Sequence, residues 1–468
     1  MSQGSDRLAY GLPSYATRVL EVLEGAGYEA WVVGGWVRDA LRGAPSHDVD
    51  VTSSAHWTQA KAALEAAGIP VHETGTAHGT ITAVVDGRPV EVTTYRVEGA
   101  YSDHRHPDEV RFVTDVREDL ARRDFTVNAM AYHPQRGILD PFGGQDDLVA
   151  GVIRAVGNPA ERFAEDALRV LRAVRFAARM GFVVEARTHE ALVEAAPTLG
   201  DIAQERIGQE LDGIVRSGKV AWALEAEREV MCAALPELSA MVGFDQRSVW
   251  HAYDVYVHTV HVCRACEEFT AGQASHALRW AALLHDIAKP NTFSIDDLGR
   301  GHFYGHPAAG AKMCEQILRR LAMPQDFIAQ VRTLVRMHDH RMYPTARSTR
   351  RTLVKIEKAC PGHARSLIYQ LIDLKRADAV SKVDRAASYA IEADEITAAV
   401  RHELSKRPPL RVADLAIGGW DVIDRLNVRP EPIVGRILDE LLIDVTNGEV
   451  DNTRSALLRH LGAVWDKK

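Results

Sequence analysis

The sequence predicts an α+β protein in which a small α/β domain precedes a long helical remainder. Between Ala30 and about Asp140, short β-branched apolar runs alternate with turn residues and helical stretches. Beyond Asn158 these runs fade, and segments rich in alanine, leucine, arginine and glutamate continue with helical periodicity. With 468 residues, 46% of them hydrophobic and 26% charged, the chain is long enough for several globular domains.

Changes of pattern and the placement of proline residues divide the chain into four predicted domains. Proline removes a helical hydrogen-bond donor and so punctuates the helical part. The domains are an α/β head at 15–157, a helical neck at 158–245, a second helical domain at 246–405 and a helical tail at 406–468. Within the head, strands are expected at 31–33, 48–52, 80–85 and 90–97.

The composition restricts the compartment and the kind of ligand. Five cysteines are few and odd in number, so we expect free thiols and a reducing compartment. No apolar run is long enough for a membrane helix, which predicts a cytoplasmic protein without a membrane partner. The formal net charge of −8 by itself favours a small-molecule enzyme over a polynucleotide binder. Arginines nevertheless cluster at 162–179 and 341–351, which allows local basic patches.

Two aspartates in the head have the spacing of a metal clamp. Asp48 and Asp50 lie in an extended, β-branched stretch, where alternate side chains point to the same face. Mg²⁺ prefers carboxylate oxygens and completes its shell with water and substrate phosphates. Two aspartates with this spacing, considered without their neighbours, are more often solvated acids than metal ligands. The surrounding sequence therefore decides between these two interpretations.

The segment before these aspartates has the pattern of a phosphate-binding turn. Gly34 and Gly35 end an apolar run and precede a helix, so bare backbone N–H groups can approach a phosphate closely. Arg38 follows on the first turns of that helix.

The residues VVGGWVRDALRG and SHDVDVTS resemble the nucleotidyltransferases of the polymerase β superfamily, in particular the bacterial class II tRNA nucleotidyltransferase and poly(A) polymerase branch. The resemblance continues through YSDHRHPDEVRF at 101–112 and EDLARRDFTVNAMAY at 118–132. It implies that Glu91 is a third carboxylate, acting as general base or outer metal support. It also implies that Arg122 and Arg123 meet the triphosphate, and that Asp124 and Asn128 organise the site locally, with Asp124 able to contact a ribose.

A mechanism for choosing bases without a template is encoded at 158–182. Arg162, Asp166 and Arg169 recur at spacings of three and four, which places them on one helical face. An aspartate accepts from an exocyclic amine and an arginine donates to a ring nitrogen, so the pair matches cytosine and adenine but not uracil or guanine. In the resembling family the E-D-x-x-R motif has this role, and Arg172 and Arg175 would add contacts to the nucleotide or its phosphate. Ordinary helix salt bridges are the alternative.

The next helical segment resembles the neck helix of the same family. In ERIGQELDGIV at 205–215, Glu205, Arg206 and Glu210 are expected to steady the nucleotide-binding helix. The overlapping run from Gly213 to Lys219 mimics a P-loop, but valine follows the lysine and no strand precedes it, so an ATPase is rejected.

A second metal centre is predicted between 258 and 378. His258, His285-Asp286 and Asp378 follow the order of the HD phosphohydrolase superfamily, and His306 and His338 could supply a second ion. Imidazole and carboxylate ligands suit a transition metal or Mg²⁺ that activates water. His261 competes with His258 for the first position. In some bacterial relatives this domain hydrolyses 2′,3′-cyclic phosphates and 2′-nucleotides, which the resemblance implies here.

The resemblance therefore implies transfer of CMP and AMP from CTP and ATP to tRNA 3′ ends with Mg²⁺, releasing pyrophosphate. The segment 417–452 resembles the family's RNA-contacting tail, although Pro430-Glu431-Pro432 replaces the common Pro-Gly-Pro. A poly(A) polymerase or A-adding enzyme shares all of these motifs and stays open. An HD phosphohydrolase whose head only senses nucleotides also stays open, whereas a non-catalytic RNA-binding protein gives no reason for the metal carboxylates.

Overall fold

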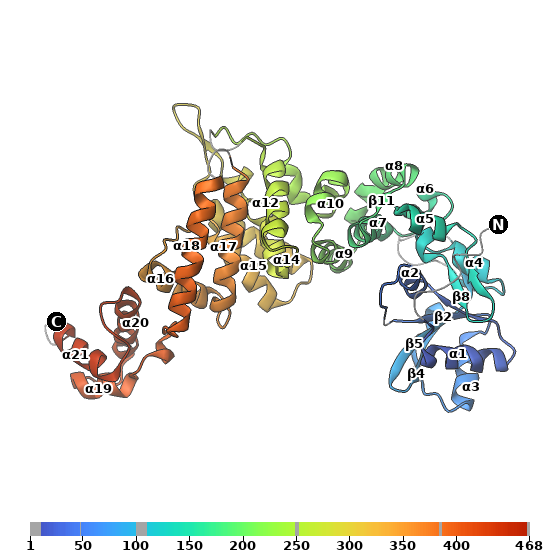
Figure 1. Ribbon diagram of the computed structural model, residues 1–468, viewed down its shortest axis with the longest axis horizontal. Coiled ribbons are helices and arrows are strands. Elements are labelled where there is room, and N and C mark those ends of the chain that lie inside the picture. The colour runs from blue at the N-terminus through green and yellow to red at the C-terminus, as the bar shows by residue number, and fades with distance from the viewer. Residues whose placement is uncertain (1–10, 47, 100–109, 249–251, 383–385, 466–468) are drawn as a thin grey trace. The chain divides into compact units, whose positions relative to one another are not determined.

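The computed structural model describes residues 11–46, 48–99, 110–248, 252–382 and 386–465, so the motif residues 101–109 lie outside the described part. The chain forms two compact units: unit 1 is Met1–Ser217 with Glu227–Ala234, and unit 2 is Gly218–Ala226 with Leu235–Lys468 (Figure 1). The predicted α+β class is confirmed, because one sheet lies in the N-terminal part and helices dominate the rest. The finer division into four domains remains a prediction.

Seven strands of unit 1 form a mixed sheet in the order β3-β4-β5-β2-β1-β8-β9. Their bounds are β1 Ala30–Val33, β2 Asp50–Ser53, β3 Val71–Gly75, β4 Thr80–Val85, β5 Arg88–Thr94, β8 Ala131–His133 and β9 Gly137–Leu139. The β2–β5 pair is parallel and the other neighbours are antiparallel. Two further pairs are small: β6 (Arg96–Glu98) with β7 (Val110–Phe112), and β10 (Val152–Ile153) with β11 (Val183–Val184).

The strands predicted at 31–33 and 80–85 are confirmed, whereas the one predicted at 90–97 divides into β5, which ends at Thr94, and β6, which begins at Arg96. A further difference concerns the metal clamp. Strand β2 begins at Asp50, so Asp48 precedes the strand instead of lying within it. In register, Asp50 lies opposite Val33 of β1 and Glu91 of β5. The prediction that the strand of Glu91 lies beside that of the aspartates is therefore confirmed.

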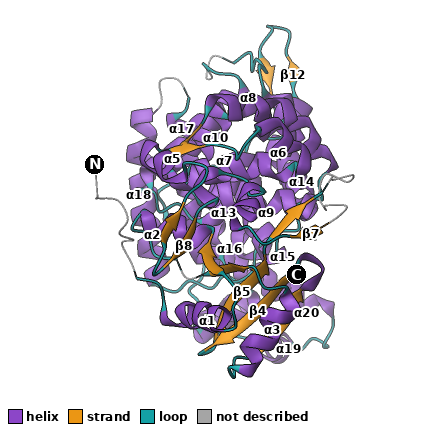
Figure 2. Ribbon diagram, turned by 90° about the vertical axis from the view of Figure 1, so that its right-hand side faces the viewer, coloured by secondary structure: helices purple, strands orange, loops and turns teal. Residues whose placement is uncertain are grey.

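Two helices, α1 (Ser14–Gly25) and α3 (Trp57–Ala66), pack against the β4–β5 part of the sheet (Figures 1 and 2). The core between them contains Leu20, Leu23, Leu64, Ile81 and Val92, each at most 2% exposed. Burial of each such side chain contributes roughly 1.5–3 kcal/mol, which is why the alternating apolar pattern of β4 fixes its register. The sheet edge that carries the aspartates thus rests on a rigid support.

The turn between β1 and helix α2 (Gly35–Leu41) requires a glycine. Gly34 has φ 73°, and a Cβ there would lie 3.0 Å from Nη1 of Arg123. A side chain at this position would therefore meet both backbone strain and a crowded guanidinium. The predicted strand, turn and helix arrangement is confirmed.

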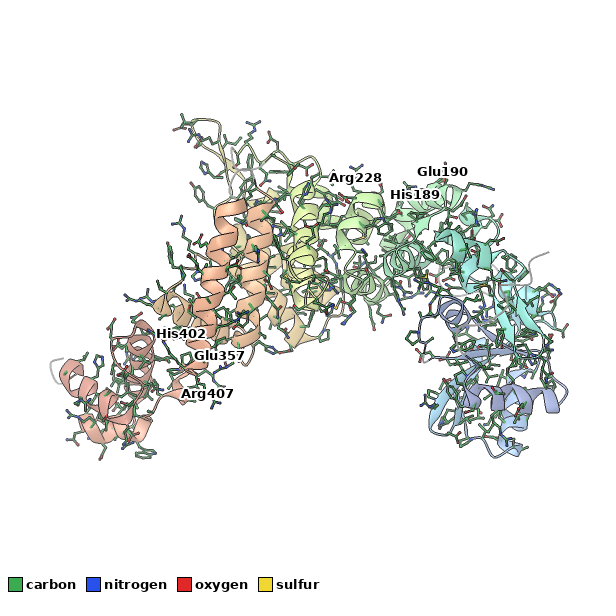
Figure 3. All side chains as sticks on the ribbon, viewed as in Figure 1. His189, Glu190, Arg228, Glu357, His402 and Arg407 are labelled. Atoms are coloured by element: carbon green, nitrogen blue, oxygen red, sulfur yellow. The ribbon has the colours of Figure 1, made fainter. Side chains whose placement is uncertain are left out.

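Unit 1 has seven further α-helices among its described residues, of which α4 precedes β8 and the others follow β9. They are α4 Val116–Ala121, α5 Gly144–Ala150, α6 Pro159–Glu165, α7 Leu168–Met180, α8 Ala186–Ala195, α9 Gln204–Arg216 and α11 Arg228–Ala234. Helix α11 belongs to unit 1 because it packs on α7 and α8. The Glu227 carboxylate, which precedes α11, lies 3.3 Å from Nε2 of His189 on α8. Figure 3 labels His189 and Arg228, the first residue of α11.

The expectation of one continuous helical face through 158–182 is wrong. Helix α6 ends at Glu165, Asp166 is extended with φ −138° and ψ 104°, and α7 begins at Leu168. The Oδ1 of Asp166 accepts from the Leu168 backbone N–H at 3.1 Å, so this aspartate caps the second helix. Aspartate favours such caps over helix interiors because its side chain competes for backbone hydrogen bonds.

Unit 2 is almost wholly helical. Its helices are α10 Val220–Ala226, α12 Val255–Phe269, α13 His276–Leu284, α14 His306–Arg320, α15 Gln325–Met337, α16 Ala346–Ala359, α17 Ala364–Val380, α18 Ala386–Ser405, α19 Gly419–Leu426, α20 Pro432–Asn447 and α21 Arg454–Trp465, with one hairpin of β12 (Ser294–Ile295) and β13 (Gly301–His302). Gly418 is the extended residue before α19, and α20 begins at Pro432. All five cysteines are free, as expected. Within the described part of the chain, no helix combines the length and hydropathy needed to cross a bilayer.

Candidate active site and candidate metal centre

A cleft of about 860 Å³ in unit 1 brings together most of the head and neck residues that the sequence singles out. Its lining includes nine arginines and five aspartates, so the cleft is locally basic although the whole chain carries −8. The charged lining residues are Arg38, Arg96, Arg122, Arg123, Arg169, Arg172, Arg175, Arg179, Arg206, Asp39, Asp48, Asp50, Asp124 and Asp166. The cleft can therefore attract a polyphosphate although the net charge of the chain is negative.

Three carboxylates meet where β2 and β5 begin to pair. Asp48 and Asp50 line the cleft, and Glu91 lies opposite Asp50 in the sheet with an exposed side chain. Burial, followed by the negative charge of Glu91, raises the pKa of Asp50, and Arg123 only partly offsets the rise. Carboxylates that disfavour one another's charge are stabilised by a divalent cation, and their oxygens are ligands that Mg²⁺ prefers. The donor set therefore fits a hard metal ion.

The two arginines of the RRDF run are anchored by a carboxylate that the sequence reasoning missed. Asp119 on α4 is completely buried; its Oδ1 accepts from Arg122 at 2.9 Å, and its Oδ2 lies 3.6 Å from Arg123. It also accepts from the Thr52 hydroxyl of β2 at 3.2 Å. The signal was the spacing of three and four between Asp119 and these arginines, which on a surface helix would indicate only a weak ion pair.

Asp124 and Asn128 lie at the centre of a hydrogen-bond network in the cleft. Arg172 donates twice to Oδ2 of Asp124, at 2.6 and 2.9 Å, and Nδ2 of Asn128 donates to its Oδ1 at 3.0 Å. Burial would raise the pKa of Asp124, but the Arg172 ion pair and the Asn128 hydrogen bond outweigh it and hold the pKa at about 2. On the opposite side, Arg38 donates to Asn128 at 2.7 Å and to Asp39 at 2.8 Å. This network fixes arginines from α2 and α7 in one place.

Asp166 and Arg169 both line the cleft, but other residues hold each of them. The Oδ2 of Asp166 accepts from Arg206 of α9 at 3.1 Å. The Arg169 guanidinium pairs with Glu165 and donates to the backbone carbonyls of Arg162 and Arg122, each at 3.1 Å. A carboxylate accepts about four hydrogen bonds and a guanidinium donates five, so both groups keep capacity for a ligand.

Helix α9 packs against α7 and holds two of the cleft residues. Glu210 is buried and accepts from Nε of Arg175 at 2.5 Å, and Arg206 holds Asp166. The run that mimics a P-loop lies at the end of this helix, which agrees with its rejection. Arg96, Arg179 and Phe176 also line the cleft, and the sequence reasoning assigned them no role.

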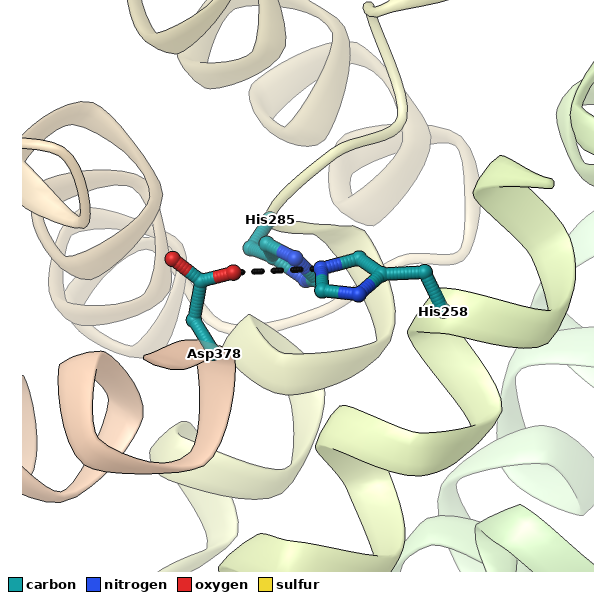
Figure 4. A group of neighbouring side chains, drawn as sticks. All are labelled: His258, His285 and Asp378. Atoms are coloured by element: carbon teal, nitrogen blue, oxygen red, sulfur yellow. Dashed lines mark hydrogen bonds and ion pairs between the residues drawn. The ribbon is translucent and has the colours of Figure 1, made fainter. Parts of the chain in front are cut away.

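The predicted metal ligands of unit 2 form two adjoining groups. His258 of α12, His285 at the end of α13 and Asp378 of α17 form the first (Figure 4), and Asp286, His306 and His338 form the second. Within each group the ligand atoms lie within 4.8 Å of one another. The Nε2 of His258 lies 3.1 Å from Asp378, whereas His261 stacks on Tyr253 outside both groups. The structure therefore places His258, and not His261, in the cluster.

The histidines present lone pairs rather than N–H groups to the centre of this cluster. The Nδ1 atoms of His285, His306 and His338 lie 2.8–2.9 Å from backbone carbonyl oxygens, which places their protons there. The Nε2 atoms of His306 and His338 then face each other at 3.1 Å, with Oδ1 of Asp286 at 3.5 and 3.7 Å.

Burial also keeps most of these rings neutral. It lowers the pKa of His338 to about 3 and lowers the pKa of His258 and His306 below the usual value. The buried Oδ2 of Asp286 lies 3.1 Å from Nε2 of His285 and 2.7 Å from Nζ of Lys289. The facing lone pairs of His306 and His338 beside the buried carboxylates are what a bound cation would satisfy, so this donor set fits one or two metal ions.

Family comparisons agree with this geometry. Residues 30–154 match the Poly A polymerase head domain, and residues 255–383 match the HD domain. The fold and the cleft thus define a nucleotidyltransferase that carries an HD domain. The CCA-adding enzyme of Limosilactobacillus reuteri is 32% identical over 451 residues, covering 95% of this chain and 94% of the relative. That of Geobacillus thermodenitrificans is 32% identical over 446 residues, covering 94% and 95%. The chain belongs to the CCA-adding enzyme family.

Solved structures of the same family share the fold. The Bacillus stearothermophilus CCA-adding enzyme in complex with CTP superimposes with a TM-score of 0.71 and 27% identity over 96% of each chain. The Thermotoga maritima CCA-adding enzyme complexed with tRNA has a TM-score of 0.58 and 19% identity, over 95% of this chain and 93% of that one, and supports the fold alone.

Proposed function

We propose that the cleft of unit 1 binds CTP and ATP and transfers CMP and AMP to the 3′ end of tRNA, releasing pyrophosphate. The observation that carries this proposal is the meeting of Asp48 and Asp50 with nine arginines in one cleft. Such an arrangement offers both metal-ligating oxygens and positive charge for a triphosphate. The CTP complex of the Bacillus stearothermophilus relative supports the choice of nucleotide.

Asp48 and Asp50 would hold Mg²⁺, with Glu91 as outer support, and the bound ion would supply Lewis-acid stabilisation of the triphosphate and of the attacking ribose oxygen. The chain's own residues have three tasks, which are to approach the phosphates, to offset their charge and to select the base. The Gly34 turn lets backbone N–H groups approach a phosphate. Arg122 and Arg123, fixed by Asp119, offset the charge that develops on the leaving pyrophosphate.

Base selection falls to Asp166 and Arg169 in this proposal. The carboxylate of Asp166 would accept from the amine of cytosine or adenine, and Arg169 would donate to the adjacent ring nitrogen. Arg206 and Glu165 hold the two side chains, so the acceptor and the donor keep a fixed separation. Arg172 and Arg175 complete the nucleotide contacts from the same helix.

The decisive experiment supplies each nucleotide separately. The purified protein is incubated with tRNA ending before CCA and with one labelled nucleoside triphosphate at a time. We expect CMP incorporation with CTP, and AMP incorporation only after two CMP additions. Incorporation of AMP alone would assign the A-adding alternative, and repeated AMP addition would assign a poly(A) polymerase.

The cluster in unit 2 supports a second activity, hydrolysis of a phosphate ester, with 2′,3′-cyclic nucleotides as the class that the resemblance implies. Its six ligands converge with neutral imidazoles, which a purely structural helical domain does not require. Asp286→Ala should abolish hydrolysis of a 2′,3′-cyclic nucleotide and leave transfer intact, whereas Asp48→Ala with Asp50→Ala should do the reverse. Loss of both activities in either variant would refute two independent sites.

A further inference from the structure

A phenylalanine ring lies among the arginines of the cleft. Phe176 of α7 is 6% exposed and lines the cleft. The guanidinium carbons of Arg38, Arg172 and Arg175 lie over its ring, at 5.2, 5.4 and 4.4 Å from the ring centroid. The ring therefore joins an arginine of α2, beside the Gly34 turn, to two arginines of the nucleotide-selection helix.

Each of these arginines is held by a carboxylate on its other side. Arg38 pairs with Asp39, Arg172 with Asp124, and Arg175 with Glu210. Arg38 and Arg172 each donate from Nε and Nη2 to their carboxylate, which already orients these two guanidinium groups. Arg175 donates to Glu210 from Nε alone, so this ion pair leaves its guanidinium plane free to turn. A cation over an aromatic face gains about 0.5–2 kcal/mol, depending on how dry the site is. The common ring thus supplies the second contact that orients Arg175 and adds to the orientation of the other two arginines.

Neighbouring residues fix the Phe176 ring and leave space for the Arg175 side chain. Phe125 packs edge-on against the ring, with centroids 5.9 Å apart. On the neighbouring helix α9, a Cβ at Gly213 would lie 2.4 Å from Cδ of Arg175. The absence of a side chain there leaves the passage by which Arg175 reaches both Phe176 and Glu210.

We propose that Phe176 is a positioning residue for ribonucleoside triphosphate binding. Its ring orients Arg38, Arg172 and Arg175 so that their N–H groups face the nucleotide, and it takes no part in the chemical step. The three cations also repel one another less because each contacts the negative face of the same ring. This inference rests on the proposed nucleotide site in the cleft.

The test compares Phe176→Leu with Phe176→Tyr in steady-state CMP and AMP incorporation on the full chain. Leucine keeps apolar volume but removes the ring, so the KM for CTP and for ATP should rise by about threefold to thirtyfold, the equivalent of the lost cation–π energy. The value of kcat should stay within about twofold, because no group of the chemical step is removed. Tyrosine keeps the ring face and should restore most of the lost affinity.

Phe163→Leu is the matched control. Phe163 of α6 is 1% exposed and, in the part of the chain that the structure describes, no arginine lies over its ring. It should lower Tm about as much as Phe176→Leu while leaving KM unchanged. The proposal is overturned by an unchanged KM in Phe176→Leu, by an equal rise of KM in Phe163→Leu, or by a Tyr variant that behaves like the Leu variant.

A parallel assay of Asp48→Ala with Asp50→Ala separates this inference from the proposed function. If that double variant still transfers nucleotides, the proposed site itself is wrong. If it does not transfer and Phe176→Leu keeps the wild-type KM, only the role of Phe176 is refuted.

Discussion

At the residue scale, Asp119 anchors two arginines that line the cleft and that we propose contact the triphosphate. Asp119→Asn keeps the size of the side chain but removes the charge that holds Arg122 and Arg123. Hydrogen bonds to charged groups contribute about 1.5–3 kcal/mol, so kcat/KM for CTP should fall by about tenfold to a hundredfold. Asp146→Asn, at an exposed position of α5, is the control and should change neither activity nor Tm. An active Asp119→Asn variant would show that the two arginines need no such anchor.

Glu227 gives a pH-dependent prediction for stability at the same scale. Burial raises its pKa to about 7, and His189 only partly opposes the rise. Since the folded-state pKa lies above the unfolded value, the stability associated with this group is full below about pH 4.5 and is lost as pH rises through about 7. Glu227→Gln removes the ionisable group. The free energy of unfolding of this variant relative to wild type should therefore increase from pH 5 to pH 8, by up to about 3 kcal/mol.

Chemical unfolding of wild type and Glu227→Gln across this pH range measures the effect. Glu190→Gln, on the exposed face of the same helix as His189 (Figure 3), should show no such pH dependence. A difference between wild type and Glu227→Gln that is constant from pH 5 to pH 8 would show that Glu227 is already ionised in the folded protein at pH 5.

The residues that the sequence revealed and those that it missed differ in a physical way. Asp48, Asp50 and Arg123 stand in runs long enough to be recognised, whereas Asp119 is significant because it is buried beneath them. Burial depends on β2 and α4 coming together, which no local spacing encodes. The sequence also contained no sign of the contacts of Phe176, because a phenylalanine in an apolar helix pattern predicts only core packing.

At the element scale, the break between α6 and α7 is the clearest departure from the sequence prediction. Periodicity in 158–182 fits one helix, since a single capped residue does not disturb the spacing of its neighbours. The tertiary contact of Asp166 with Arg206 of α9 favours the extended backbone. Asp166 therefore caps α7 and, in the proposed function, also accepts a hydrogen bond from a base.

These two tasks can be separated by comparing Asp166→Asn with Asp166→Ala. Asparagine still caps a helix, so Asp166→Asn should keep the wild-type free energy of unfolding. Asp166→Ala removes the cap and should lower that free energy by about 1 kcal/mol. The Asn amide can donate as well as accept, so it can pair with a carbonyl of uracil or guanine. We expect UMP incorporation relative to CMP to rise at least about tenfold in Asp166→Asn. Unchanged base preference in this variant would assign selection to other residues.

At the scale of the whole molecule, the acidic net charge conceals the basic cleft. The same distribution of charge explains why composition by itself pointed towards a small-molecule enzyme, whereas the chain belongs to a family that acts on tRNA. Division into units was also beyond the sequence, because Glu227–Ala234 returns to unit 1 after Gly218–Ala226 has joined unit 2. Such an exchange depends on the packing of α10 and α11, and no composition shift marks it.

The two candidate metal centres predict different responses to metal removal. The centre of unit 1 offers carboxylates, which suit Mg²⁺, whereas the centre of unit 2 offers four imidazoles with two carboxylates, which suit a transition metal. After treatment with a chelator both activities should fall, by more than about a hundredfold for transfer, since the triphosphate loses its main charge stabilisation. Mg²⁺ added back should restore nucleotide transfer, while hydrolysis of a 2′,3′-cyclic nucleotide should require Mn²⁺, Co²⁺ or Ni²⁺. In Asp286→Ala, Mg²⁺ should still restore nucleotide transfer, but no metal ion should restore hydrolysis. If Mg²⁺ by itself restored hydrolysis to its initial rate, the imidazoles of His258, His285, His306 and His338 would not be the ligands that set the choice of metal.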